Sequence, residues 1–359
     1  MSNYRWEKKT FRVGEADAGF GRLFGRSSWG IYHDPRYLRV LAQHNGAVPE
    51  LFFYGDEENF VYYPYFKRSL PDFPEDDCEI DLQEYCDIIS SWYYGGPIVT
   101  TEVEGESQLR KILIEEFLDS FREYCREEKI VSEFVRFDPI IENYRDFRDR
   151  LGLELTGKTV YVNLGESMDK IWDLFEGRNR TAIRKARGEP LTVEEGTNLE
   201  KLRKFNEIYT EEMDRKGAGD HYRFGVEFFE ELAQRLGDQF HFFTMRYRDR
   251  IIGGGIVLES GGTAHDYLRA SRPEYWDYNC NNYLLFKEIE WFQEAGRDIF
   301  DLQGGRPGVF NFKKAFSPLR GEFHTAGIIH DPPIHDKLVS LAGVENGDNE
   351  EDYFPEYRC

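Results

Sequence analysis

Two stretches of this sequence carry several basic side chains and no acidic one. The first lies between Gly177 and Gly188 and contains Arg178, Arg180, Arg184, Lys185 and Arg187. If this stretch is helical, Arg180, Arg184 and Arg187 share one face, because their spacing is i, i+4 and i+7. Such a face suits a polyanionic phosphate, which arginine binds through paired N–H groups. The alternative is a solvated basic face whose charges pair with carboxylates elsewhere.

The second basic stretch runs from Leu302 to Gly321 and follows a predicted strand. Its basic residues are Arg306, Lys313, Lys314 and Arg320. It opens with Gly304 and Gly305, and a glycine loop after a strand can bring backbone N–H groups onto an anion, although Gly-Gly also serves any tight turn. We therefore assign Gly304, Gly305 and Arg306 to a predicted substrate-binding site.

Lys313 is the strongest candidate for a catalytic role among the basic residues, because Phe310, Phe312 and Phe316 surround it in the sequence. A lysine held between aromatic side chains is partly desolvated and can act as a positioned cation or as a donor to a developing oxyanion. The alternative is a lysine that extends over a phenylalanine core and keeps its ammonium group in water. Asp301, at a strand end, and Tyr267 are candidates for a general base by position alone.

Other catalytic motifs are absent from the sequence. It contains no G-x-S-x-G, no P-loop and no H-E-x-x-H. His330, Asp331, His335 and Asp336 are metal ligands only by residue type, and their stretch contains two prolines, so we predict no metal site. The run Gly253-Gly254-Gly255 inside a strand pattern indicates a bulge or a close approach of the backbone to a ligand.

These residues must be positioned by two sets of elements. In the first half, the residues 48–54 and 60–65 read as a hairpin, and a short helix is predicted around 82–91. A long amphipathic helix follows, and a strand is predicted over 133–137. The apolar face of that helix contains Leu109, Ile112, Leu113, Phe117, Phe121 and Tyr124.

The second half repeats this plan. Strands are predicted over 240–247, 251–258 and 263–270, a helix over 282–295 and a strand over 299–302. Short amphipathic helices are expected between the halves, near 168–175, 199–213 and 228–236. Hairpin, helix and strand in the same order suggest a duplicated α/β unit, although many α+β folds share this order.

The length of 359 residues predicts two domains. A boundary near Gly157 gives an N-terminal domain over 1–156 and a C-terminal domain over 157–335. The remaining segment, 336–359, is acidic and is predicted to be disordered.

Composition excludes several classes of protein. The formal net charge is −21, which argues against a broad nucleic-acid surface and against a polybasic membrane-surface binder. The excess of acid fits ordinary solubility or a high-salt cytoplasm. A hydrophobic content of 40% with 29 Phe, 22 Tyr and 6 Trp excludes a disordered chain.

The sequence also predicts a compartment. The first residues show no apolar signal segment, and no run approaches the ~18 apolar residues of a membrane span, so no integral membrane segment is expected. The cysteines form no C-x-x-C pair, which favours buried, inert thiols in a reducing cytoplasm. They are Cys78, Cys86, Cys125, Cys280 and Cys359. The oligomeric state stays open.

In combination, these motifs resemble a known group of transferases. The segments that carry the resemblance are 180–188, 253–255, 282–286, Gly296 with Asp301, Phe312-Lys313 with Phe316, and the turn Tyr94-Gly95-Gly96-Pro97. Their order is similar to that in the FemABX peptidoglycan bridge-forming aminoacyltransferases and their BioF2-like acetyltransferase relatives of the GNAT superfamily. The resemblance covers roughly residues 45–325.

The resemblance implies a fold and a site. The fold would be α/β (α+β), with two tandem GNAT-like domains whose mixed sheets are flanked by helices. Phe312-Lys313 matches the family's pair near the transferred acyl group, and Arg184-Lys185 matches its basic helix. Lys67 and Arg68 are looser candidates for the acceptor's phosphates. Tyr94 and Asn282 lie in matching segments and complete the implied substrate site.

The resemblance also implies acyl or aminoacyl transfer to an amine. The donor would be an aminoacyl-tRNA or an acyl-CoA, and no cofactor would be tightly bound. The coiled-coil arm of some members and a clear R/Q-x-x-G-x-G/A loop are both missing, so the choice between the two donors stays open. The acceptor would be a nucleotide- or lipid-linked glycan precursor of the cell envelope. Two alternatives remain: a CoA-dependent N-acetyltransferase of a small amine, and a non-catalytic module that binds an anionic ligand.

Overall fold

The computed structural model describes residues 6–12, 29–72, 81–102, 105, 107–343 and 354–358. Internal contacts divide the chain into two compact units. Unit 1 comprises Tyr32–Thr156, strand β1 and the chain from Phe323 onward, and unit 2 comprises Gly157–Glu322 with a short segment around Trp29. The chain enters unit 2 after Thr156, at the predicted boundary.

The chain returns to unit 1 at Phe323, whereas the sequence predicts that the second domain extends to residue 335. The reason is strand pairing. Residues 325–329 pair antiparallel with residues 132–136 of unit 1, and this pairing was not visible in the sequence because its partners are far apart along the chain.

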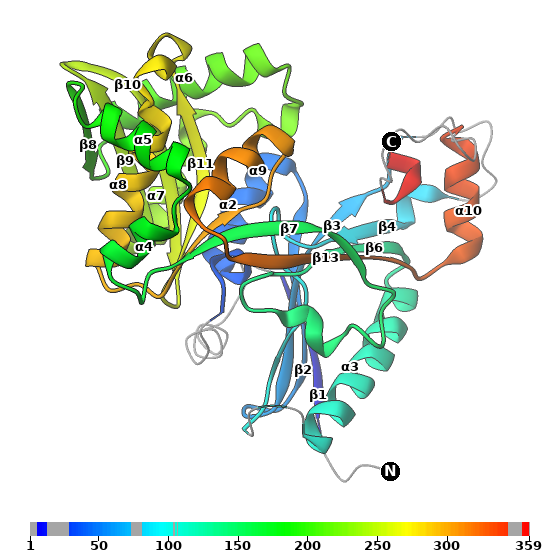
Figure 1. Cartoon of the computed structure of the whole chain (residues 1–359). Coiled ribbons are helices and arrows are strands. Elements are labelled where there is room, and N and C mark those ends of the chain that lie inside the picture. The colour runs from blue at the N-terminus through cyan, green and yellow to red at the C-terminus, as the bar shows by residue number, and fades with distance from the viewer. Residues whose placement is uncertain are drawn as a thin grey trace. The chain divides into compact units, whose positions relative to one another are not determined.

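Unit 1 is a mixed sheet in the order β1-β2-β3-β4-β6-β13, with β5 on β3 (Figure 1). Its one parallel pair among the described strands is β4 with β6. The strands are β1 (Glu7–Arg12), β2 (Val48–Gly55), β3 (Phe60–Ser69), β4 (Cys86–Ile89), β5 (Ile98–Thr100), β6 (Ile130–Arg136) and β13 (Arg320–Ile329). The helices are α2 (Pro35–Asn45), α3 (Gln108–Glu127) and α10 (Pro332–Leu341).

Helix α3 confirms the predicted amphipathic helix. Ser107 caps its first turn by accepting a hydrogen bond from the backbone N–H of Arg110 at 3.1 Å. Phe117 and Phe121, one turn apart, pack against Phe52 of β2, with ring centroids 5.9 and 4.9 Å away. The periodic apolar face of the sequence therefore meets the sheet as expected.

The helix predicted over 82–91 is wrong. Only a short 3-10 turn, Leu82–Glu84, precedes strand β4. Cys86 and Ile88 both enter the apolar core, whereas Asp87 between them points away to Arg68. This alternation has the period of two that a strand requires, and four residues were too short a run to reveal it.

The strands of unit 2 follow the order β7-β12-β11-β10-β9-β8 and have mixed directions. Its described strands pair antiparallel except for β11 with β12, which are parallel. The strands are β7 (Glu154–Asn163), β8 (Leu191–Glu195), β9 (Phe240–Tyr247), β10 (Arg250–Ser260), β11 (Thr263–Ser271) and β12 (Ile299–Gln303). The predicted strands and the predicted class, mixed sheets flanked by helices, are confirmed.

Helices cover both faces of the unit 2 sheet. Phe243 of β9 contacts Phe292 of α8, while its neighbour Phe242 points to the opposite face and contacts Phe205 of α6. The helices are α4 (Met168–Leu174), α5 (Gly177–Ala186), α6 (Leu199–Lys216), α7 (Val226–Leu236), α8 (Cys280–Glu294) and α9 (Pro307–Lys313). Helix α5 is the predicted basic helix, and α8 and β12 follow each other as α3 and β6 do in unit 1.

The described part of the segment 336–359 is ordered, which differs from the predicted disorder. Helix α10 extends to Leu341, and Tyr357 is buried beneath it. The acidic residues that suggested disorder fall mainly within 344–353, outside the described residues. Within the described residues, no helix is both long and apolar enough to cross a membrane.

Candidate active site in unit 2

A β-bulge in strand β11 sets the geometry of the candidate site. The pairing with β10 shifts between Ile256 and Val257, so that Tyr267 is the extra residue of β11. A bulge displaces the alternation of side chains by one residue. Asp266 and Arg269, three residues apart, therefore face the same way, and Nη2 of Arg269 donates to Oδ1 of Asp266 at 2.9 Å.

Four charged side chains meet at this bulge. Arg269 also donates to Oε2 of Glu288 on α8, at 2.5 Å. The Nζ atom of Lys313, at the end of α9, lies 3.6 Å from Oδ2 of Asp266. Glu288 is fully buried and Lys313 is only 9% exposed. Two acids and two bases are thus enclosed in the core of unit 2, where each depends on its partners.

Burial perturbs the protonation of this network. It lowers the pKa of Lys313, with a contribution from the charge of Arg269, although Asp266 opposes the shift. It raises the pKa of Glu288 to about 7, against the opposing charge of Arg269. For Asp266, burial raises the pKa, but Arg269 and Lys313 together outweigh it and leave that pKa below its ordinary value. Lys313 is therefore a weakly solvated cation of increased acidity.

Lys313 approaches Asp266 of β11 just beyond the last residues of β11 and β12 that pair with each other. The parallel pairing of the two strands extends only to His265 and Asp301, whose Nδ1 and Oδ2 atoms lie 3.1 Å apart. Oδ1 of Asp301 accepts from the backbone N–H of Gln303 at 2.8 Å, and Gln303 has a φ of 63°. The chain then turns away from the sheet and returns through α9. Ligands of parallel sheets commonly bind at such carboxyl ends of strands.

The other predicted catalytic residues lie in the same part of unit 2. Asp301 is fully buried, and Tyr267, at the bulge, is 1% exposed. Phe312 is half-buried, and its ring lies 5.4 Å from that of Phe316. The structure therefore brings Lys313, Asp301 and Tyr267 onto adjoining elements.

Cys280 of α8 is not a nucleophile in this fold. Burial raises the pKa of Cys280 to about 11, which keeps this thiol protonated.

The glycine loop before α9 has a local structural reason. Gly305 has a φ of 144°, and a Cβ there would lie 2.8 Å from Cγ1 of Val309. Only glycine adopts this turn without strain. Gly304 is half-buried beside the carbonyl oxygen of Lys158. Arg306 is exposed at the start of α9 and forms no ion pair with the residues that the structure describes.

The basic face of α5 divides into two parts. Nη1 of Arg180 donates to the carbonyl oxygens of Asp173 and Phe175, at 2.9 and 2.7 Å, and so closes the end of α4. The guanidinium group of Arg184 lies over the Trp172 ring at 5.3 Å, and both Arg184 and Lys185 are exposed. Arg184 and Lys185 can therefore contact a ligand, whereas the guanidinium group of Arg180 is already hydrogen-bonded to the backbone at the end of α4.

Asn282 links two helices of unit 2. Its Nδ2 atom on α8 donates to Oδ1 of Asn179 on α5 at 2.9 Å. Nδ2 of Asn179 in turn donates to the carbonyl oxygen of Ala315 at 3.2 Å. The segment after Lys313 is thus held by both helices.

Three predicted binding residues belong to unit 1. Lys67 pairs with Glu128 at 2.9 Å. Arg68 pairs with the buried carboxylate of Asp87 at 2.7 Å. Tyr94 is 3% exposed, with its ring 5.2 Å from that of Tyr32. Lys67 and Arg68 therefore contribute ion pairs to unit 1.

Sequence reasoning missed Arg269 and Glu288. A signal for Glu288 was present, because it falls on the apolar face of α8 with Leu284, Leu285 and Phe292. A carboxylate on such a face requires a buried partner. Arg269 left no comparable signal, because the bulge that turns it toward Asp266 cannot be read from residue types.

Comparisons with known proteins identify the fold. Residues 176–314 match the family model of the acetyltransferase (GNAT) domain. A crystal structure of FemX shares 14% identity with a TM-score of 0.66, and the match covers 92% of this chain and 99% of that chain. A tandem GNAT protein from the clavulanic acid biosynthesis pathway shares 9% identity with a TM-score of 0.51, covering 91% of this chain and 99% of that chain.

A third solved structure has the same fold. It is the C-terminal domain of a putative lysylphosphatidylglycerol synthetase from Agrobacterium fabrum, with 12% identity and a TM-score of 0.55, and the match covers 91% of this chain and 95% of that chain. No curated protein sequence matches the chain. The predicted resemblance to GNAT proteins and to FemX is therefore confirmed for the fold, and the matched GNAT segment contains Phe312 and Lys313.

Proposed function

We propose that this protein is an acyltransferase that moves an acyl or aminoacyl group from an activated ester or thioester to an amine, with its reaction centre in unit 2. The observation that carries the proposal is Lys313. This buried ammonium group lies 3.6 Å from Asp266, inside the segment that matches the GNAT domain, at the point where β12 ends beside β11. Its lowered pKa makes it a stronger hydrogen-bond donor than an exposed lysine.

The chemistry needs such a donor. The neutral amine attacks the carbonyl carbon, a C–N bond forms, and the carbonyl electron pair moves onto oxygen. The C–S or C–O bond to the leaving group then breaks, and the proton lost by the amine ends on the leaving group or on solvent. The Nζ–H groups of Lys313 stabilise the oxyanion between these steps, and Asp266 holds them in place.

The remaining predicted residues have defined roles in this proposal. Phe312, beside Lys313, forms the apolar wall against the acyl chain. Tyr267, at the bulge, is the candidate relay for the amine proton: its hydroxyl oxygen accepts that proton as its own O–H proton passes to the leaving group or to solvent. Asp301 is held by His265 and by the backbone N–H of Gln303, and it orients the turn that leads to Lys313.

Among the described residues of unit 1, the parallel pair β4 and β6 shows no corresponding opening. This pair is followed by a further bridge between Gly95 and Phe137. Nδ2 of Asn143 donates to the carbonyl oxygens of Gly95 and Pro97, at 2.8 and 3.2 Å, and fixes this closed arrangement. The contrast with β11 and β12 supports unit 2 as the half that performs the transfer.

Both donor classes have support. The GNAT domain match favours acyl-CoA, and the likeness to FemX favours an aminoacyl donor with a cell-envelope or glycan precursor as acceptor. Exposed Arg184, Lys185 and Arg306 suit the phosphates that either donor carries. A CoA-dependent N-acetyltransferase of a small amine is the second candidate, on the strength of the GNAT match.

The experiment compares Lys313→Met with Lys314→Met. Ligands that co-purify with the protein are first identified by mass spectrometry, and transfer from acetyl-CoA and from aminoacyl-tRNA is then measured with amine acceptors chosen from that result. Lys313→Met is expected to reduce kcat by a factor of about 100 or more when it is assayed well below its own thermal midpoint. That midpoint should also fall, because the buried carboxylate of Asp266 loses a partner. Lys314→Met, one residue away, is expected to keep the wild-type rate.

Two outcomes would contradict the proposal. Full activity of Lys313→Met would remove Lys313 from the reaction. Absence of transfer from either donor, with a nucleotide-sugar still bound, would favour the non-catalytic binding module.

A further inference from the structure

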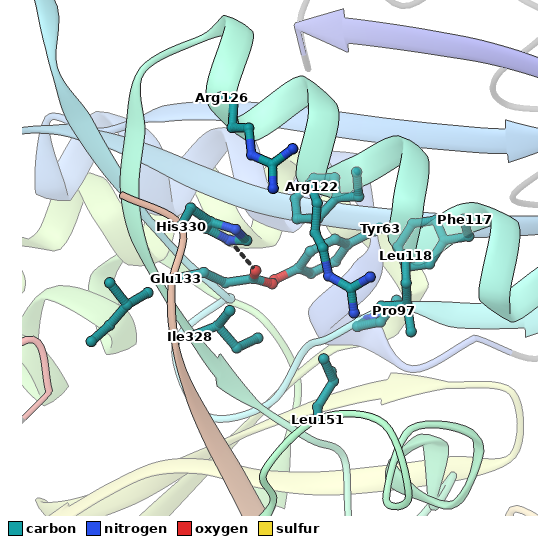
Figure 2. A pocket seen from close by; sticks show the side chains of 12 residues that line it. Tyr63, Pro97, Phe117, Leu118, Arg122, Arg126, Glu133, Leu151, Ile328 and His330 are labelled. Carbon is teal, nitrogen blue, oxygen red and sulfur yellow. Dashed lines mark hydrogen bonds and ion pairs between the residues drawn. The ribbon is translucent and has the colours of Figure 1, made fainter. Parts of the chain in front are cut away.

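Unit 1 contains a cavity that the proposed transfer does not use. It has a volume of about 110 Å³ and lies between α3 and strands β3, β6 and β13 (Figure 2). Its apolar walls are formed by Pro97, Phe117, Leu118, Phe121, Leu151 and Ile328. At ~30 Å³ per water molecule in the liquid, this volume has room for roughly four heavy atoms, so the rest of a longer ligand must extend out of the cavity toward the exposed arginines.

A buried carboxylate lies inside the cavity. Glu133 of β6 is 4% exposed. Its Oε1 accepts from the hydroxyl group of Tyr63 at 2.5 Å, and its Oε2 lies 2.8 Å from Nε2 of His330 (Figure 2). Burial and the charge of Glu133 both raise the pKa of Tyr63 well above 10, so Tyr63 remains a donor. The two donors hold Glu133 in an otherwise apolar wall, where it can attract a cation.

Two arginines line the same cavity. Arg122 and Arg126 lie one turn apart on α3. Figure 2 shows Arg126 reaching from that helix toward His330, and Arg122 reaching past Tyr63 toward Pro97. Both are exposed. Arg122 pairs with Asp119 at 2.8 Å, whereas Arg126 has no carboxylate partner among the residues that the structure describes.

The charge around the arginines is mixed. A groove beside the cavity is lined by both arginines together with Glu116, Asp119 and Glu123. These acids disfavour a polyanion such as a nucleotide at this position. A ligand with one negative group, which Arg126 is free to receive, is compatible with them.

We propose that this cavity binds a small zwitterion, with an ammonium group and a carboxylate at the two ends of a short apolar chain. The ammonium group lies at Glu133, the carboxylate pairs with Arg126, and the methylene chain packs against Phe117 and Phe121. The two charged ends of the ligand thus form ion pairs that offset their cost of desolvation, and its methylene chain contacts an apolar wall. The site is independent of the transfer reaction proposed for unit 2.

The test uses the full chain and three probes of equal length. Isothermal titration calorimetry compares 5-aminovalerate with pentylamine, which lacks the carboxylate, and with pentanoate, which lacks the ammonium group. We expect 5-aminovalerate to bind at least tenfold more tightly than either analogue. Arg126→Ala should reduce its affinity to about that of pentylamine and leave pentylamine binding unchanged. Glu133→Gln should reduce its affinity to about that of pentanoate and leave pentanoate binding unchanged.

Arg145→Ala is the matched control, because this exposed arginine of unit 1 pairs with Glu142 and does not line the cavity. It should bind 5-aminovalerate as the wild type does. Equal affinities for 5-aminovalerate and pentanoate would overturn the role of Glu133, and absence of binding by all three probes would overturn the site. Near-ultraviolet circular dichroism checks that Glu133→Gln is folded. If it is not, titrations of the three probes into the wild type and into Arg126→Ala are sufficient to test the proposed site.

Discussion

Gly255 of β10 lies directly against the carboxylate of Glu288, so that a Cβ atom added at residue 255 would overlap Oε1. The glycine run in β10 was predicted to indicate a bulge or a close approach of the backbone to a ligand. A bulge adjoins this run in the pairing of β10 with β9, where Ile252 is the extra residue of β10. The close approach observed is that of a buried side chain, and Gly255 provides the space in which Glu288 meets Arg269.

Gly255→Ala is therefore expected to destabilise unit 2. Strand β10 is fixed between β9 and β11, and Glu288 is fully buried, so neither neighbour can move without loss of packing. We expect the free energy of unfolding in urea to fall by about 2–3 kcal/mol. Gly308→Ala is the control, because no atom lies within 4 Å of its added Cβ, and a change within ~0.5 kcal/mol is expected. Equal stability of the two variants would contradict this role of Gly255.

Glu288 should also make the stability of unit 2 depend on pH. Burial raises its pKa to about 7 in the folded chain, from an ordinary value of 4.5, so folding favours its neutral form. This contribution is fully present below pH 4.5 and is lost as pH rises through about 7. Glu288→Gln keeps an acceptor for Arg269 and cannot ionise. Its stability relative to the wild type should therefore increase between pH 5 and pH 8, by up to ~3 kcal/mol.

Urea titrations of both proteins at several pH values measure this difference. Asp266, Arg269 and Lys313 are common to both proteins, so their own contributions cancel in the comparison and the difference reports Glu288. A difference that is constant with pH would show that the pKa of Glu288 is not raised in the fold.

Most elements of the fold could be predicted from periodicity. The apolar stripe of α3, the hairpin of β2 and β3, and the strands β9, β10 and β11 all follow patterns of three to four or of two residues. Strand β4 was missed because four residues carry too little pattern. The return of β13 to unit 1 was missed because it depends on a partner about 190 residues away along the chain.

The candidate site was only partly predictable. Residue types and the family resemblance were sufficient to select Lys313, because a lysine that directly follows Phe312 in a segment with three phenylalanines is unusual. They did not reveal Arg269 or Glu288, since Arg269 reaches Asp266 through a bulge and Glu288 reaches Arg269 through the packing of α8. Arg180 was selected for its position on a helical face, although its hydrogen bonds to α4 depend on the loop between two helices, which periodicity does not describe.

The two parts of the basic face of α5 can be separated by stability. Arg180→Ala removes hydrogen bonds to the carbonyl oxygens of Asp173 and Phe175, which end α4. We expect it to lower the free energy of unfolding by about 1–2 kcal/mol. Arg184→Ala, on the exposed part of the same face, should change it by less than ~0.5 kcal/mol. Thermal or urea unfolding of the two variants measures this, and a larger loss for Arg184→Ala than for Arg180→Ala would reverse the assignment.

Arg358 is expected to stabilise unit 1, although it lies in the segment predicted to be disordered. Nε of Arg358 lies 2.5 Å from Oδ2 of Asp87, a carboxylate with no exposed surface that also pairs with Arg68. Without Arg358, the buried negative charge of Asp87 is balanced by Arg68 alone, and a buried charge with fewer partners destabilises the fold. Arg358→Ala should therefore lower the free energy of unfolding by about 1–3 kcal/mol. Lys129→Ala, which removes an exposed ion pair with Glu84, should leave the urea midpoint unchanged. An equal effect of both variants would mean that the end of the chain contributes no more than a surface contact.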